Sequence, residues 1–180
     1  VNIKVKELTG KLRLNKKNLE WKYYIIMEIT NLNLNEITKD RIKKHEGLVL
    51  KMYDDPIHGD AAPTIFYGHL CTNDDRWQKG IEYTIEDAEK VFEEDYEICK
   101  SAGDRFIGNI EVPAIVRSIV YEVAFNIGET RLRLFKKMQQ GIKDQDFEKA
   151  GLELEDSKLY RTLTSRYEPL VKLMKGAVNG

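Results

Sequence analysis

Apolar and polar positions alternate in one part of the chain and recur at helical spacing in the rest. Residues 48–53 alternate as a half-buried strand does, and the β-type run 64–68 predicts a second strand of the same small sheet. Residues 35–46, which precede these strands, predict a helix that directs Ile37, Ile42 and His45 toward the core and ends at or near Glu46. The first part of the chain therefore predicts one helix followed by a small sheet.

From Thr84 onward the pattern is helical. Thr84 opens a capping-box-like signature, and apolar side chains recur at helical spacing as far as about Ser101. This helix of roughly 18 residues would be about 27 Å long, which suits a connector between two lobes. A further helix is predicted to begin at Val112-Pro113 and to end at Gly128. Three more helices are predicted over residues 131–140, 145–154 and 159–175.

These elements together predict an α+β fold with two lobes. A small β-sheet lobe is expected over about residues 46–80 and a connector helix over about residues 84–101. An all-helical lobe is expected over about residues 108–180. The lobes belong to one domain that spans residues 27–180.

Residues 1–26 form a basic N-terminal extension before this domain. Residues 1–25 hold seven Lys and Arg against two acidic residues, whereas the rest holds 22 basic and 28 acidic residues, a net charge of −6. Alternation predicts a short hairpin that turns at Gly10. The extension is either a solvated arm or a basic segment that contacts an anionic partner, and both interpretations stay open.

Composition excludes several classes of protein. The whole chain has a formal net charge of −1, so no general field attracts nucleic acid. No stretch approaches the roughly 20 apolar residues of a membrane helix, and no signal-peptide core is present near residue 1. Cys71 and Cys99 are too few for a disulfide scaffold and fit a reducing compartment, although a bridge between them stays open.

Candidate chemistry lies between Glu46 and His69. Hydrolysis of a glycosidic bond needs a protonated carboxyl group for the leaving oxygen and a carboxylate that activates water or attacks the sugar. Glu46, at the end of an amphipathic run, and Asp55, in a loop, suit these two roles, and Thr64 could orient the water. Spacing alone is weak support, because a third of the residues are charged.

Four segments together resemble the phage-type lysozymes of glycoside hydrolase family 24. They read EGLxLKxYxD at 46–55, TIxYGHL at 64–70, FNIGET at 125–130 and DSKLYRxLxSR at 156–166. The resemblance implies an inverting muramidase that cuts the β-1,4 bond between N-acetylmuramic acid and N-acetylglucosamine in peptidoglycan. Glu46 would be its general acid, with Asp55 and Thr64 handling the water. Neither a metal nor an organic cofactor is implied.

The resemblance also implies supporting residues. His69 and Asp95 would pair and hold the sheet lobe to the connector helix, a structural role that we favour over catalysis for His69. Arg166 would hydrogen-bond and orient Glu46, or make a purely structural contact. Leu70 and Phe125 would either line the cleft that faces the sugar or belong to the core.

The chain departs from the family pattern at three places. Phe66 stands where the family usually has glycine, and the interval from Asp55 to Thr64 is a few residues longer than usual. The longer loop makes Asp60 a rival for the second carboxylate. The segment after Gly128 lacks the Ser-Thr-Leu often found there, so its sugar contacts are open.

Two alternatives to a free endolysin stay open, and the longer loop suggests the first of them. One is a cell-wall-binding module that has lost activity. The other is a lysozyme associated with a phage tail or baseplate, docked to phage structural proteins through residues 1–26. We expect a monomer whose partner is peptidoglycan, made in the host cytoplasm without a signal peptide. It would reach the cell wall by release through a pore or by delivery in a particle.

Overall fold

The computed structural model describes residues 33–54, 63–72 and 75–178. The hairpin predicted around Gly10 and the N-terminal extension lie outside these residues. The chain divides between Leu34 and Asn35, and the part from Asn35 onward forms one compact unit. The fold and the candidate site both belong to this second unit.

Residues 33–46 are helical, and Glu46 is the last helical residue, as predicted. Gly47 follows with φ of +74°, a left-handed conformation that commonly ends a helix. The prediction for Ile37 was wrong, since this side chain is 50 % exposed. The inward position belongs to its neighbour Thr38, which is fully buried and hydrogen-bonded to Ser118 Oγ at 2.5 Å. The prediction for Ile42 is confirmed, since this side chain is fully buried, whereas His45 is exposed. A polar contact thus replaces the expected apolar one at the first of these positions only.

The small sheet has three antiparallel strands in the order β1-β2-β3. They are β1 (Val49–Asp54), β2 (Pro63–Phe66) and β3 (His69–Leu70). The predicted second strand was too long, because the chain turns at Tyr67-Gly68 and Gly68 takes φ of +85°. This turn converts one predicted strand into a hairpin, with Thr64 opposite Leu70.

Phe66 adopts φ of +60°, although it is not glycine. This left-handed conformation is disfavoured for residues with a Cβ atom, so glycine, which the resemblance led us to expect at this position, would adopt it without strain. The ring is 1 % exposed. It packs edge-on against Trp77 at 4.8 Å and Tyr83 at 6.1 Å between ring centroids. Aromatic packing therefore offsets the backbone strain.

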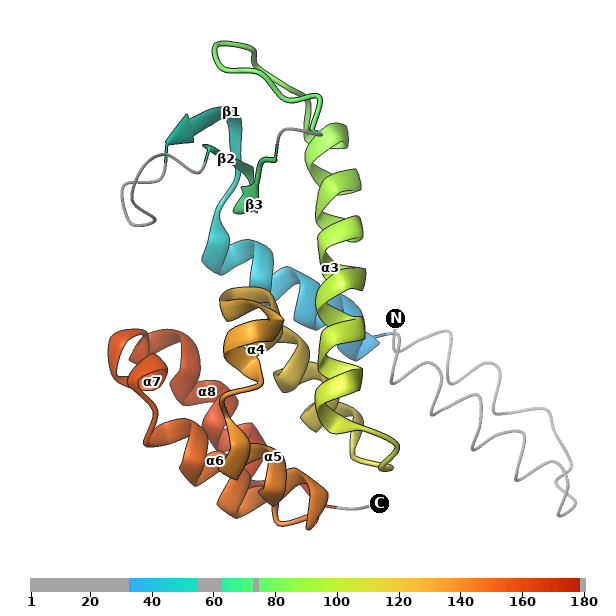
Figure 1. Ribbon diagram of the computed structural model, residues 1–180, viewed down its shortest axis with the longest axis vertical. Coiled ribbons are helices and arrows are strands. Elements are labelled where there is room, and N and C mark those ends of the chain that lie inside the picture. Colours follow the sequence, from blue (N-terminus) through green and yellow to red (C-terminus); the bar gives the residue numbers. More distant parts are fainter. Residues whose placement is uncertain (1–32, 55–62, 73–74, 179–180) are drawn as a thin grey trace, which may run out of the picture. The chain divides into compact units, whose positions relative to one another are not determined.

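The connector helix is α3 (Ile85–Ile107), and it contacts both the sheet and the helical lobe (Figure 1). Its predicted capping box is confirmed, because Thr84 and Asp87 each bond the other's backbone N–H. The predicted end near Ser101 was wrong. The helix continues through Gly103, where a Cβ atom would lie 2.5 Å from Tyr121 Cδ1. This glycine permits a close approach to the next helix instead of ending its own.

The helical lobe begins with α4 (Ala114–Leu132), whose start lies close to the predicted one at Val112-Pro113, with Pro113 at the N-cap position and no side-chain cap hydrogen bond. The predicted break at Gly128 is present as a kink with φ of +73°. The first of the three further helices starts later than predicted, and the last is broken at Leu163, whose φ of −127° and ψ of +46° are not helical. The remaining helices are α5 (Lys136–Lys143), α6 (Phe147–Glu155), α7 (Lys158–Thr162) and α8 (Thr164–Lys175).

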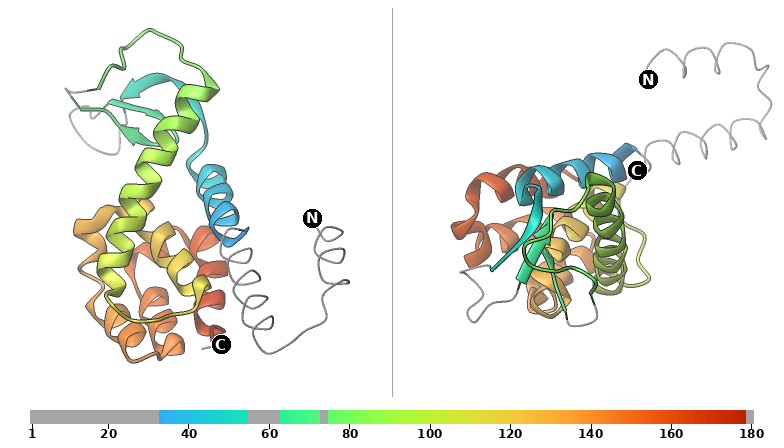
Figure 2. Two further views of the ribbon diagram at one scale, coloured as in Figure 1. Left: turned by 90° about the vertical axis from the view of Figure 1, so that its right-hand side faces the viewer. Right: turned by 90° about the horizontal axis from the view of Figure 1, so that it is seen from above.

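The main hydrophobic core lies in this lobe, around the buried side chains of α4. Val116, Ile119, Val120 and Val123 are fully buried within it, and α3, α5, α6 and α8 pack around the same cluster (Figure 2). The fold class predicted from the sequence is confirmed: the chain is α+β, with a small antiparallel sheet and a larger helical lobe joined by α3. None of the described helices is long and apolar enough to cross a membrane.

Candidate active site

Glu46 is held by an arginine that is 120 residues away in the sequence. Arg166 Nη1 donates to Glu46 Oε1 at 2.7 Å. The Arg166 side chain is 7 % exposed and that of Glu46 is 21 % exposed. The carboxyl group is therefore anchored from α8, while part of the Glu46 side chain stays open to solvent.

The turn between β2 and β3 lies on the other side of this carboxyl group. A Cβ atom built on Gly68 would be 3.6 Å from Glu46 Oε2. The φ of +85° at Gly68 disfavours every other residue, so the glycine that makes the turn also brings backbone close to the carboxyl group. Glu46 thus lies where the 33–46 helix, the sheet lobe and α8 meet.

Thr64 belongs to β2 and is 5 % exposed. It stands opposite Tyr53 in β1 on one side and opposite Leu70 in β3 on the other. The two candidates for the second carboxylate, Asp55 and Asp60, lie outside the described residues. The structure therefore brings Glu46 and Arg166 into contact, positions Thr64 on the neighbouring sheet, and leaves the second carboxylate as a prediction.

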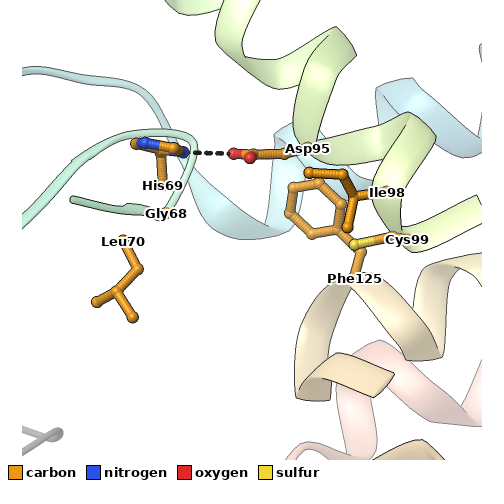
Figure 3. Close-up of a pocket in the computed structure, with 7 residues that line it drawn as sticks. All are labelled: Gly68, His69, Leu70, Asp95, Ile98, Cys99 and Phe125. Carbon is orange, nitrogen blue, oxygen red and sulfur yellow. Dashed lines mark hydrogen bonds and ion pairs between the residues drawn. The ribbon is translucent and has the colours of Figure 1, made fainter. Parts of the chain in front are cut away.

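His69 forms a hydrogen bond between its Nδ1 and Asp95 Oδ2 at 2.8 Å, which joins β3 to α3 (Figure 3). Its Nε2 lies 3.6 Å from Asp75 Oδ1. The hydrogen bond with Asp95 is the main reason that the pKa of His69 is raised, against the opposing effect of burial. The pKa of Asp75 is lowered, chiefly by the backbone N–H of Thr72.

A pocket of about 210 Å³ lies beside this pair. Leu70 and Phe125 contribute to its wall, and so does Ile98, which is 65 % exposed. In Figure 3 the side chains of Ile98, Cys99 and Phe125 gather beside the His69–Asp95 pair, while Leu70 lies apart from them. The complete lining is Gly68, His69, Leu70, Asp95, Ile98, Cys99 and Phe125.

Both cysteines are free thiols. Burial raises the pKa of Cys71 to about 11 and that of Cys99 to about 12, so both thiols are protonated at neutral pH. Protonated thiols are poor nucleophiles and poor metal ligands. In the part of the chain that the structure describes, no three His, Cys, Asp or Glu side chains are grouped as a metal site.

Sequence reasoning missed Glu122, a fully buried glutamate on α4. Its Oε2 accepts from Arg41 Nε at 2.9 Å, and its Oε1 lies 4.0 Å from Arg166 Nε. A signal was present in the sequence, because Glu122 interrupts the apolar run that predicts α4. A charge in such a position is buried in the fold and therefore needs partners.

An α+β fold with a long helix between its sheet and helical lobes, and an arginine-anchored glutamate where they meet, defines a lysozyme-like protein. The phage lysozyme family model matches residues 43–165, and the chain belongs to that family. The match covers more than half of the chain and includes Glu46 and Thr64, while Arg166 follows it directly. A search of curated proteins found no match. Family membership confirms the predicted resemblance and implies a glycoside hydrolase that acts on the bacterial cell wall.

Proposed function

We propose that this protein is an endolysin-type N-acetylmuramidase. Its substrate is the β-1,4 bond between N-acetylmuramic acid and N-acetylglucosamine in peptidoglycan, and hydrolysis inverts the anomeric carbon. The observation that carries the proposal is the state of Glu46, whose carboxyl group is anchored by Arg166 at 2.7 Å while its side chain is 21 % exposed. A general acid needs both a fixed direction and access to the leaving oxygen.

Glu46 acts as the general acid. Arg166 binds Oε1, and Oε2 faces the backbone of Gly68, where no side chain stands in the way. Proton transfer is efficient only when donor and acceptor lie within hydrogen-bonding distance in a fixed orientation. The contact with Arg166 restricts rotation of the carboxyl group and so favours one direction of transfer.

Asp55 and Thr64 handle the attacking water. Asp55 follows directly after the last residue of β1, and Thr64 is the second residue of the strand paired with β1. An inverting mechanism needs the two carboxyl groups about 6.5–9.5 Å apart, so that a water molecule fits between the base and the sugar. Thr64 would hold this water through its hydroxyl group.

The sugar is bound by side chains on both sides of the pocket. Leu70 comes from the sheet lobe and Phe125 from α4, and apolar side chains of this kind pack against the faces of sugar rings and their acetyl groups. The His69–Asp95 hydrogen bond joins β3 to α3 and so supports the Leu70 side of the pocket. We assign His69 and Asp95 a structural role, and the active form is a monomer.

The purified chain incubated with peptidoglycan tests this function. We expect release of reducing ends, and borohydride reduction before acid hydrolysis should convert muramic acid, not glucosamine, to its alcohol. NMR at early times should detect the α-anomer first, because inversion of a β bond yields it. Sedimentation with cell walls without reducing-end release would instead identify a binding module.

The second carboxylate is tested by comparing Asp55→Asn with Asp60→Asn. We expect Asp55→Asn to lower kcat by about 10²–10⁴-fold, the usual contribution of an acid or base. Asp60→Asn serves as the matched control and should stay within about threefold of wild type. The reverse pattern would transfer the role of base to Asp60.

A further inference from the structure

Charged side chains of alternating sign, two of them buried, link three helices next to Glu46. Arg41, from the 33–46 helix, donates to Glu122 Oε2 at 2.9 Å. Glu122 Oε1 lies 4.0 Å from Arg166 Nε, and Arg166 in turn binds Glu46 at 2.7 Å. The side chains of Glu122 and Arg166 are 0 % and 7 % exposed. Opposite charges so close to one another and so far from water interact strongly.

The guanidinium group of Arg166 has one hydrogen-bond partner within the described residues, which is Glu46. Its Nε and Nη2 are buried without a partner there, and so is Glu122 Oε1. Buried polar atoms left in this state cost about 1–3 kcal/mol each, so they are normally satisfied. The 4.0 Å between Arg166 Nε and Glu122 Oε1 is the kind of separation that one bridging water spans.

Glu122 itself is fixed by neighbours that do not touch Glu46. Arg41 also donates from Nη2 to Ser118 Oγ at 3.0 Å, and Ser118 shares a hydrogen bond with Thr38 at 2.5 Å. Ser118 and Thr38 are buried. The carboxylate of Glu122 is therefore a rigid, negatively charged group beside the guanidinium group of Arg166.

We propose that Glu122 is a positioning residue, which holds Arg166 in the orientation that directs the Glu46 carboxyl group. This inference rests on the proposed role of Glu46 as general acid. Without Glu122, Arg166 would keep one bond to a partly exposed carboxyl group and could rotate about its side-chain torsions. The carboxyl group would then lose its fixed direction while the pocket that binds the sugar keeps its lining.

The first test is Glu122→Gln, assayed by reducing-end release at a temperature well below unfolding. We expect kcat to fall by about tenfold, with KM within about twofold of wild type, because transfer geometry is disturbed and sugar contacts are not. Tyr121→Phe is the matched control. It removes a neighbouring, partly buried hydrogen bond, from Tyr121 Oη to Asp104 at 2.6 Å, and should lower stability without changing kcat.

A second variant covers the case in which Glu122→Gln fails to fold. Arg41→Gln combined with Glu122→Gln removes both members of the ion pair, which costs less than breaking the pair from one side. The same loss of kcat is expected. A folded variant of either kind with the kcat of wild type would overturn the proposal.

Epistasis shows whether Glu122 acts through Arg166. In an Arg166→Gln background, Glu122→Gln should cause no further loss of kcat, because the group that it positions is already gone. A further tenfold loss in this background would mean that Glu122 acts by another route, and the proposal would be wrong.

Crystal structures of wild type and Glu122→Gln give a readout that does not depend on hydrolysis. We expect the Arg166 Nη1–Glu46 Oε1 contact to be kept in wild type and broken in the variant. If this holds but wild type releases no reducing ends, the proposed function fails while the positioning of Arg166 by Glu122 stands. If wild type is active and the contact survives in the variant, the positioning role fails instead.

Discussion

Replacing Phe66 by glycine and by alanine separates its backbone strain from its packing. Both variants delete a ring that is 1 % exposed and lies edge-on to Trp77 at 4.8 Å, so both should lose about 3–5 kcal/mol of stability. Alanine keeps the cost of a left-handed residue at φ of +60°, about 1–2 kcal/mol, which glycine avoids. Relative to alanine, glycine lowers the free energy of unfolding by about 0.5–1 kcal/mol, because it makes the unfolded chain more flexible. Phe66→Gly should therefore be more stable than Phe66→Ala by about 0.5–1 kcal/mol.

The matched control is the same pair of variants at Phe92, a residue with equal exposure inside α3. There glycine should be the less stable variant by about 1 kcal/mol, because a helix interior disfavours it. Urea unfolding of the four variants measures both differences. If glycine is worse than alanine at Phe66 by the same margin as at Phe92, the left-handed strain at Phe66 is not present.

Three other substitutions probe the helix contact, the His69 anchor and the buried arginine. Gly103→Ala places a Cβ atom 2.5 Å from Tyr121 Cδ1 and should cost about 1–3 kcal/mol in urea unfolding; an unchanged midpoint would contradict the close helix approach. His69→Asn should destabilise the protein more at about pH 5.5 than at about pH 8.5. The hydrogen bond to Asp95 raises the pKa of His69, so its contribution is fully present below about 6.5 and is lost as the pH rises through the raised value. A loss that does not change with pH would refute this linkage. Arg166→Met leaves Glu46 without its cation and leaves the fully buried Glu122 with Arg41 alone, and it should cost about 3–5 kcal/mol by the same unfolding assay. A loss below about 1 kcal/mol would show that Arg166 contributes little to compensating these two carboxylates.

Local signals predicted the elements that carry the site. The end of the first helix at Glu46, the cap at Thr84 and the break at Gly128 were all readable, because each depends on residues within one turn of the chain. The predictions failed where a distant contact decides the backbone. Gly103 permits a close crossing with Tyr121, which no pattern within α3 reveals.

The site residues were likewise predictable only where the signal is local in the sequence. Glu46 and Thr64 were found through local motifs, and Arg166 was matched to Glu46 only through family resemblance, since the two are 120 residues apart. Glu122 was missed, although its charge within an apolar run was visible. Periodicity predicts that a position is buried, but its ionic partners come from other helices and depend on the packing.

The break at Leu163 shows a third kind of failure. Apolar spacing over residues 159–175 is continuous and predicts one helix, yet the chain forms α7 and α8. Thr162 and Thr164 each donate a hydroxyl hydrogen bond to a backbone carbonyl four residues earlier, at 2.9 Å and 3.0 Å. Such bonds compete with the helical ones and favour a bend.

The central claim, that Glu46 is the general acid, is tested most directly by Glu46→Gln. Glutamine keeps an oxygen that can accept from Arg166, so stability should stay within about 2 kcal/mol of wild type. Glu89→Gln is the matched control, because Glu89, which lies on α3, accepts hydrogen bonds from Lys43 and Tyr67 and has no proposed part in the chemistry.

Initial rates of reducing-end release from peptidoglycan should be compared for the folded proteins. We predict that Glu46→Gln loses about 10²–10⁴-fold in kcat, as expected when a proton donor is removed, and that Glu89→Gln stays close to wild type. A folded Glu46→Gln that clears cell walls at the rate of wild type would contradict the account.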